Sequence, residues 1–178
     1  MRIISIHTYT SPIGDLLLGS FQDSLCMCDW KYRKSRLTVN KRIQEGLHAH
    51  FEESRTAVIS TAIEQLQEYF AGERQSFGLP LLMVGTEFQQ SVWDELIKIP
   101  FGQTETYLSL TNKIGNLNTI RAVAAANGAN AISIIVPCHR IIGSDGNLVG
   151  YAGGLDAKKK LLQLENKDKF PEQLELFG

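Results

Sequence analysis

The stretch ISIIVPCHR, residues 132–140, decides most of what can be predicted for this chain. Its first part, Ile132–Val136, is a short run rich in β-branched side chains, which predicts a buried strand. Pro137 fixes its own φ angle and restricts the residue before it, so the backbone is stiff where this strand ends. The sequence therefore predicts that Cys138 and His139 are held in place at the end of a buried strand.

The neighbouring cysteine and histidine favour a nucleophilic site over a structural cysteine. The thiolate is the reactive form of cysteine, and imidazole is the usual base near neutral pH. Adjacent side chains on an extended segment point to opposite sides, so we expect a bridging water between Cys138 and His139. Glu165, in the next predicted helix, is a carboxylate that can orient the imidazole, although a surface glutamate is the alternative.

Three helical stretches precede this segment. The first begins at Thr86, which forms a capping-box pattern with Gln89, and carries an apolar stripe to Ile99. Two shorter stretches, 107–114 and 119–127, are joined by a turn that contains Gly115 and predict a helix-turn-helix. The last of them is almost smooth on one side, which serves either close helix packing or close approach to another surface, through Ala122, Ala125, Ala126 and Ala129.

The N-terminal part predicts a small antiparallel sheet. Three apolar runs, 2–8, 16–21 and 25–30, read as strands, and the first two are joined by a turn rich in Pro and Gly. Residues 56–70 repeat apolar side chains at helical spacing, so this helix should cover the sheet. We therefore expect an α+β chain with an α/β domain over 1–85, a second, mostly helical domain over 86–166 and a flexible tail over 167–178.

Composition excludes little. The net charge of −1 gives no hint of nucleic acid, and 43% hydrophobic residues are typical of globular proteins. Residues 31–42 hold six basic and no acidic residues, which favours a solvated loop, with a DNA-facing strip as the alternative. No apolar run approaches the roughly 18 residues that span a bilayer, so no membrane role is expected.

The cysteines and histidines indicate a reducing compartment rather than a metal site. Three cysteines without a Lys/Arg-led apolar leader favour the cytoplasm over a secreted disulfide framework. Some of these residues allow a zinc reading, but their spacing fits no standard finger, so packed strands and exposed histidines are favoured. The residues that allow this zinc interpretation are Cys26, Cys28, His48 and His50. We expect no metal there and no cofactor in the protein.

The motifs of the second domain together resemble the O6-alkylguanine-DNA alkyltransferase family, the methylated-DNA–protein-cysteine methyltransferases. The resemblance runs from Phe88 to Glu165 in the same order and spacing, and is looser before Gly85, where 11–14 resemble the family's early turn. It rests on FQQSVW at 88–93, IPFG at 99–102, RAV at 121–123, Asn130, PCHR at 137–140 and GYAGG at 150–154. It implies a ribonuclease H-like first domain and a winged-helix, helix-turn-helix second domain that binds DNA.

The resemblance also implies an activity and a catalytic set. The family repairs DNA by moving a methyl or larger alkyl group from O6 of guanine onto its own cysteine, once per molecule. Cys138 is then the acceptor, His139 the water-bridged base and Glu165 its orienting carboxylate. Asn130 braces the turn around the site, and Tyr107 donates a proton or hydrogen bond to the departing guanine.

The same resemblance assigns the contacts with DNA. The damaged base must leave the stack before its O6 can meet a sulfur atom. Arg121 is then expected to fill the gap, and the alanine face of its helix, Ala122, Ala125 and Ala126, to approach the minor groove. The carbonyls of Cys138 and Ile141 read the guanine edge, and Tyr151, Ala152 and Gly153 wall the pocket. Some relatives carry serine at the place of Ala152, so here only the backbone N–H can serve.

Double-stranded DNA with O6-alkylguanine is the expected partner of a monomeric chain, and activity on O4-alkylthymine is left open.

The tail holds Gln173-Leu174-Glu175-Leu176-Phe177, which resembles the short motif that binds the bacterial sliding clamp. We expect Gln173, Leu174, Leu176 and Phe177 to make that contact, with a frayed end or a strip folded on the body as alternatives. Two rival functions are a non-catalytic sensor similar to the alkyltransferase-like proteins, which lack the acceptor cysteine, and a cysteine hydrolase.

Overall fold

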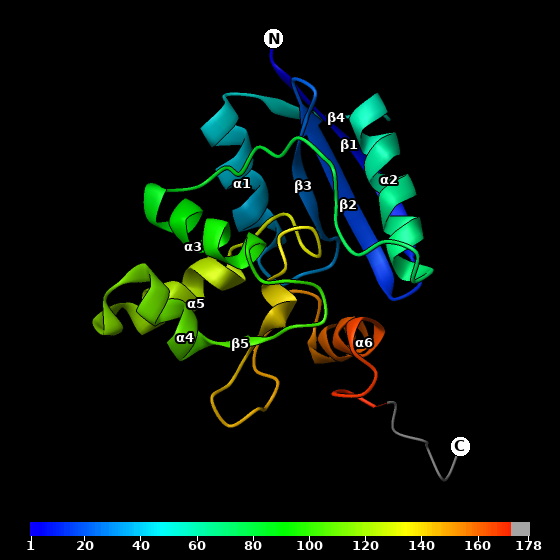
Figure 1. Ribbon diagram of the computed structural model, residues 1–178. Helices are drawn as coiled ribbons and strands as arrows, with labels where there is room; N and C mark the ends of the chain where they lie inside the picture. The colour runs from blue at the N-terminus through cyan, green and yellow to red at the C-terminus, as the bar shows by residue number, and fades with distance from the viewer. Residues whose placement is uncertain (172–178) are drawn as a thin grey trace.

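The computed structural model describes residues 1–171, and the tail motif at 173–177 lies outside the described residues. The N-terminal half is a sheet of order β3-β2-β1-β4 (Figure 1). Strands β1 (Ile3–Ser11), β2 (Gly14–Phe21) and β3 (Ser24–Trp30) form the predicted antiparallel meander, while β4 (His50–Glu53) runs parallel to β1 and was not predicted. The predicted turn is tight because Ser11 Oγ accepts from the Ile13 N–H and donates to the Gly14 carbonyl.

The two faces of the sheet carry different helices. The predicted helix α2 (Ala57–Phe70) packs its buried side chains on the face formed by Leu16, Leu18 and Leu25. Helix α1 (Arg36–Leu47) packs on the other face, against Ile4, and Figure 1 shows the sheet between the two helices. The expectation of a solvated loop over 31–42 is therefore wrong for 36–42, which lie in α1, whereas 31–35 form turns. The basic run hides an apolar repeat, since Val39, Ile43 and Leu47 recur every fourth residue and are buried.

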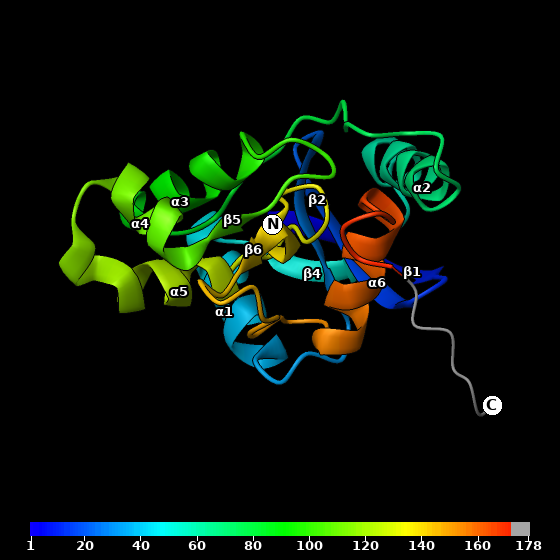
Figure 2. The ribbon, with the colours of Figure 1, turned by 60° about the horizontal axis from the view of Figure 1, so that its bottom comes forward.

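The second half confirms the helix-turn-helix. Helix α3 (Glu87–Ile97) begins with the predicted capping box, in which both reciprocal hydrogen bonds of Thr86 and Gln89 are formed. Helix α4 (Tyr107–Ile114) ends at Gly115, whose φ of 101° suits glycine, and the short helix η1 (Leu117–Thr119) leads into α5 (Ile120–Gly128). Figure 2 shows α3, α4 and α5 grouped together, with the last helix, α6 (Leu155–Glu165), beside α2.

The predicted strand over Ile132–Val136 is wrong, because the segment forms consecutive turns. Ile134 has a φ of 72°, and only Ile132 forms an isolated bridge, with Cys28 of β3. Cys28 donates to the Ala131 carbonyl and accepts from the Ser133 N–H, at 2.9 and 2.7 Å. Ile132, Ile134 and Val136 are buried as predicted and Ile135 is half-buried, but this burial needs no ladder once the backbone groups find these partners.

One apolar cluster joins the two halves of the chain. It contains Leu18 and Leu66 from the first half, and Trp93, Val136 and Leu161 from the second. The turns at 131–136 lie between the sheet and the helices of the second half. The second half also contains a short pair of parallel strands, β5 (Glu105–Thr106) and β6 (Ile141–Ile142). The segment that carries the cysteine is therefore held from both sides. Within residues 1–171, no helix is both long and apolar enough to cross a membrane.

Candidate active site

Cys138 opens a single turn of 3-10 helix, η2 (Cys138–Arg140), directly after Pro137. Asn130 closes the preceding turns, since its Nδ2 donates to the Val136 carbonyl at 2.8 Å and its Oδ1 accepts from the Ile132 N–H at 3.0 Å. Successive residues of a 3-10 helix lie about 120° apart, so the side chains of Cys138 and His139 diverge even though the backbone is not extended. Cys138 itself is buried, with 4% of its surface exposed.

His139 and Glu165 are in direct contact inside the protein. His139 Nε2 lies 2.7 Å from Glu165 Oε1, and both side chains are buried. The alternative of a surface glutamate is therefore wrong. The other ring nitrogen of His139, Nδ1, is also buried and has no hydrogen-bond partner among the described residues. The bond to the carboxylate places the ring proton on Nε2, which leaves Nδ1 as an acceptor.

Two further side chains bind the same carboxylate. Arg140 donates from Nε to Oε2 and from Nη2 to Oε1, both at 2.9 Å, and from Nη1 to the Ile99 carbonyl at 2.6 Å. Tyr69 of α2 donates its hydroxyl to Oε1 at 2.7 Å. Sequence reasoning missed Tyr69, because its position in an amphipathic helix reads as ordinary core. The carboxylate thus joins groups from both halves of the chain.

Burial and charge set the protonation of these groups. Burial lowers the pKa of His139, and its bond to Glu165 opposes this only in part. Burial alone would raise the pKa of Glu165, but the hydrogen bonds and charges of His139 and Arg140 hold it well below its usual range. Burial raises the pKa of Cys138, against the opposing effects of Asn130 and Lys158. At neutral pH the site therefore holds a thiol, a neutral imidazole and a carboxylate, so the thiol needs a base before it can react.

A cavity of about 540 Å³ lies against Cys138. Its size falls in the range of small-molecule pockets. Tyr107 donates its hydroxyl to the Val149 carbonyl at 3.3 Å, and burial raises its pKa, so the hydroxyl keeps its proton. Helices α4 and α5, the first half of the chain and the wall segment, residues 149–152, all contribute to the lining, which includes Arg33, Tyr107, Ala124, Asn127, Tyr151 and Ala152. A larger hollow of about 640 Å³ near Met1 and α1 is lined in part by His48 and His50, but by none of the candidate catalytic or DNA-binding residues.

Two residues expected at the pocket lie elsewhere. Gly153 is not among the lining residues and packs on Trp30, where a Cβ atom would lie 2.5 Å from the indole ring. Its lack of a side chain lets the wall segment approach the sheet. Ile141 is fully buried in β6 and also does not line the cavity, so the contact of its carbonyl with guanine stays a prediction.

Helix α5 presents only part of the predicted alanine face. Arg121, Ala122 and Ala125 are exposed, as contact with another molecule requires. The expectation that Ala126 lies on the DNA-facing surface is wrong, because Ala126 is 2% exposed and its carbonyl accepts from Trp93 Nε1 at 2.8 Å. Residues four apart on a helix are offset by about 40° around its axis, so Ala126 is turned from the direction of Ala122 toward that of the buried Val123.

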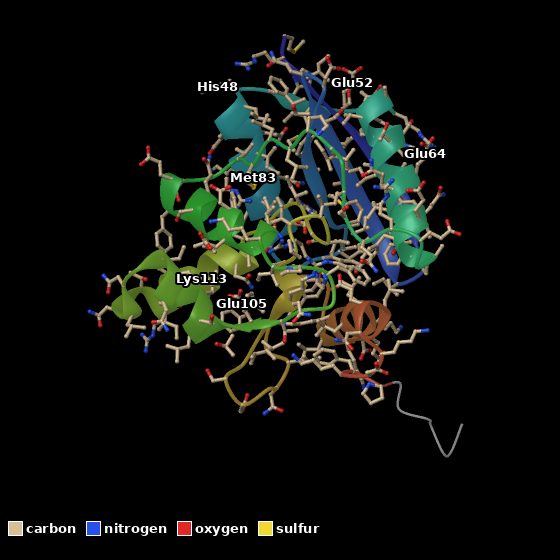
Figure 3. The ribbon with its side chains drawn as sticks, in the orientation of Figure 1. His48, Glu52, Glu64, Met83, Glu105 and Lys113 are labelled. Atoms are coloured by element: carbon tan, nitrogen blue, oxygen red, sulfur yellow. The ribbon has the colours of Figure 1, made fainter. Side chains whose placement is uncertain are left out.

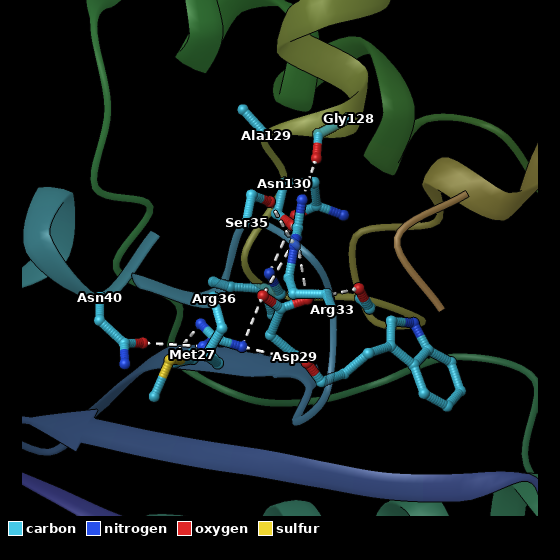
Figure 4. Close-up of polar contacts among 12 residues, drawn as sticks. Met27, Asp29, Arg33, Ser35, Arg36, Asn40, Gly128, Ala129 and Asn130 are labelled. Atoms are coloured by element: carbon cyan, nitrogen blue, oxygen red, sulfur yellow. Dashed lines mark hydrogen bonds and ion pairs between the residues drawn. The ribbon is translucent and has the colours of Figure 1, made fainter. Parts of the chain in front are cut away.

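Arg33 ties the sheet to the end of α5, so the expectation of a solvated side chain is wrong at this residue, while the alternative of a DNA-facing strip stays a prediction. Its guanidinium donates to the buried Asp29 carboxylate at 3.1 Å, to the Gly128 carbonyl at 2.6 Å and to the Asn130 carbonyl at 3.1 Å (Figure 4). Arg36 joins the same carboxylate at 2.9 Å. The guanidinium groups of Arg33 and Arg36 are therefore paired inside the protein, as those of a solvated loop would not be.

Lys158 was not predicted either. It is fully buried and donates to the carbonyls of Val149 and Gly150, at 3.0 and 3.2 Å, so it holds the wall segment from below. Burial lowers its pKa to about 8. Nothing in the sequence distinguishes it from Lys159 and Lys160, because only the helix phase in the folded chain turns it inward.

The residues considered for zinc are separated in the structure. Cys26 and Cys28 are buried on β3, and His50 is half-buried. His48 is exposed at the end of α1 (Figure 3). Over residues 1–171, no group of three or more His, Cys, Asp or Glu side chains is placed to hold a metal ion. Glu105 of β5 instead forms an ion pair with Lys113 of α4 (Figure 3).

Two family models together match most of the chain. Residues 4–83 match the ribonuclease-like domain of 6-O-methylguanine DNA methyltransferase, and residues 87–167 match its DNA binding domain. A methylated-DNA–protein-cysteine methyltransferase of Methanosarcina acetivorans is 45% identical over 157 residues, which cover 88% of this chain and 95% of that protein. The protein of that name from Mycobacterium tuberculosis is 43% identical over 178 residues, 98% and 99% of the two chains.

Solved structures agree with this. The fold matches Mycobacterium tuberculosis OGT in complex with DNA with a TM-score of 0.77 at 39% identity, over 93% of each chain. It matches the O6-methylguanine methyltransferase of the same organism with a TM-score of 0.74 at 40% identity, over the whole of both chains.

Proposed function

Because the chain belongs to the 6-O-methylguanine DNA methyltransferase family, we propose that it repairs DNA by transferring a methyl or larger alkyl group from guanine O6 to Cys138. One observation carries the proposal. Cys138 lies at a base-sized cavity while its neighbour His139 keeps one ring nitrogen free and binds Glu165 through the other. This arrangement can remove the thiol proton at the place where a base can enter.

The transfer is a displacement at carbon. The Cys138 thiol loses its proton through a bridging water to His139 Nδ1, and its sulfur attacks the alkyl carbon. A C–S bond forms as the C–O6 bond breaks, and the electron pair leaves with guanine. Tyr107, whose hydroxyl stays protonated, donates a proton or hydrogen bond to the departing guanine, because expulsion of an unassisted anion is costly. Glu165 remains ionised and holds the Nε2 proton of His139.

The reaction ends after one transfer. The product is a thioether, whose sulfur would have to leave carbon as a thiolate without any activating group. No change of oxidation state takes place, so the step needs no redox cofactor. The protein is therefore consumed by its own reaction.

The contact with DNA uses the exposed side of α5. Rotating the damaged nucleotide out of the stack costs a few kcal/mol. We place Arg121, exposed at the start of the helix, in the gap, while Ala122 and Ala125 let the backbone approach a minor groove about 6 Å wide. The base then enters the cavity. Some relatives carry serine at the place of Ala152, so here only the backbone N–H of this residue can donate a hydrogen bond to the base.

The two rival functions fit less well. A sensor of alkyl damage needs no acceptor, whereas the Cys138 side chain meets the cavity. A cysteine hydrolase needs a histidine in direct reach of the sulfur, and on η2 the two neighbouring side chains diverge. Both arguments favour alkyl transfer.

Intact-protein mass spectrometry tests the proposal. After incubation with a duplex that contains one O6-methylguanine, the mass should rise by one CH₂ group, which peptide mapping should locate on Cys138. Cys138→Ser should show no increase, and Cys26→Ser, which changes another buried cysteine, should react like the wild type. A methyl group on another residue would refute the assignment.

We further propose that the protein works as a monomer in the cytoplasm, where its free cysteines stay reduced.

We also propose that Gln173, Leu174, Leu176 and Phe177 dock on a sliding clamp, because three large apolar side chains in a polar segment suit a partner's groove. A tether of this kind raises the local concentration of the enzyme at replicating DNA. Titration of the purified clamp against the full chain and a chain that ends at Pro171 tests the contact, which equal or absent binding in both would exclude.

A further inference from the structure

Tyr69 brings the first half of the chain to the carboxylate of the proposed relay. It is fully buried on α2, and its hydroxyl lies 2.7 Å from Glu165 Oε1. Its ring is held between those of Phe70, Phe77 and Phe101, with centroid distances of 5.3, 5.6 and 6.2 Å. The hydroxyl is therefore fixed in position.

The oxygen that Tyr69 contacts is the one that holds His139. Oε1 accepts from Tyr69, from His139 Nε2 at 2.7 Å and from Arg140 Nη2 at 2.9 Å. Donors to one oxygen share its negative charge, so each of them weakens the hold of the carboxylate on the others. Burial and the charge of Glu165 raise the pKa of Tyr69 well above its ordinary value, so the hydroxyl donates at every working pH.

We propose that Tyr69 is a positioning residue that limits how strongly Glu165 stabilises a proton on His139. This inference rests on the relay of the proposed function. In such a relay His139 must be neutral before the reaction and accept a proton during it, so its pKa has to remain below the working pH. A carboxylate without the tyrosine would stabilise the imidazolium more strongly and leave the base protonated at higher pH.

The other groups around His139 do not replace this effect. Arg140, on the same 3-10 turn, and Lys158, from α6, both lower the pKa of His139 by their positive charge, and Glu165, also from α6, raises it. Cys138 precedes it on the turn and is uncharged before the reaction. Tyr69, from α2, is a neutral donor that acts only through the carboxylate. The effect of its removal on His139 should therefore be a higher proton affinity of the imidazole.

Tyr69→Phe removes the hydroxyl and keeps the ring. Single-turnover rates of methyl transfer from a duplex with one O6-methylguanine are measured from about pH 5 to about pH 9. The acid limb of the profile should move to higher pH by about half a unit, since a hydrogen bond to the charged form of a carboxylate changes its basicity by an amount of this order. An NMR titration of the His139 ring should show the same upward shift.

Two further variants separate this role from a structural one. Tyr9→Phe changes a half-buried tyrosine on the same core but outside the carboxylate cluster, and should leave the acid limb in place. Incorporation of 3-fluorotyrosine at position 69 keeps the hydroxyl as a more acidic donor, and should shift the limb to lower pH. This second substitution also decides the question if Tyr69→Phe does not fold.

The outcomes distinguish this inference from the function on which it rests. Loss of the wild-type midpoint from the acid limb in His139→Ala, together with an upward shift in Tyr69→Phe, supports both. An acid limb that stays in place or moves down in Tyr69→Phe overturns the inference, even if thermal stability falls, because a merely structural role lowers the rate equally at all pH values. An acid limb that keeps the wild-type midpoint in His139→Ala overturns the relay itself.

Discussion

Asn130→Ala should loosen the turns that hold Cys138. The variant leaves the buried Ile132 N–H without its acceptor, whereas the Val136 carbonyl keeps the bond from the Cys138 N–H at 2.8 Å and loses only the bond from Asn130. One buried group left unpaired costs about 1–3 kcal/mol and one lost bond about 1 kcal/mol, so the free energy of unfolding should fall by about 2–4 kcal/mol. Displacement of the sulfur should slow transfer by about tenfold to a hundredfold.

Urea unfolding, followed by the fluorescence of the buried Trp30 and Trp93, measures the stability change, and a single-turnover assay measures the rate. Asn147→Ala is the matched control, because this asparagine is exposed and its loss should cost less than about 0.5 kcal/mol. If Asn130→Ala cost no more than the control and transferred at the wild-type rate, the bracing role of Asn130 would be refuted.

Four other changes test separate parts of the mechanism. Cys138→Ser should abolish transfer while binding to damaged duplex, measured by fluorescence anisotropy, stays within about twofold, since the substitution is nearly isosteric. Arg121→Ala should weaken binding to a duplex with O6-methylguanine more than to undamaged duplex, and equal losses on both would contradict the gap-filling role. Lys158→Met should reduce transfer by about tenfold or more through a loosened wall segment, and a wild-type rate would exclude that contact from the mechanism. The free energy of unfolding should fall as the pH drops below about 6.5, because the unfolded state then binds a proton at His139 that the folded state resists. It should fall further below about pH 4.3, because Glu165 is then protonated in the unfolded state. A urea-unfolding free energy that stays constant between about pH 7 and pH 4 would contradict these directions.

Local signals in the sequence were sufficient where the structure is itself local. The capping box of Thr86 and Gln89 and the turn at Gly115 each depend on neighbours a few residues away, and both are present. The meander of the first three strands has the same origin. Helix α1 is not apparent from the composition of 31–42, because its basic residues obscure the four-residue spacing of the apolar side chains.

Features that depend on distant partners could not be predicted from single positions. Residues 132–136 have the composition of a strand, yet Cys28 and Asn130 provide their backbone bonds in a turn. The inward turn of Ala126 depends on how α5 packs on Trp93. Contacts such as Tyr69 with Glu165, 96 positions apart, leave no pattern in one sequence.

The measurement that tests the central claim most directly is an active-site titration. A known amount of protein is mixed with a large excess of duplex that carries a labelled methyl group on guanine O6, and protein-bound label is followed to its plateau. The account predicts one methyl group per chain, located on Cys138, with no further loss of O6-methylguanine from the DNA. Continued loss of O6-methylguanine after the plateau, or label on a residue other than Cys138, would contradict it.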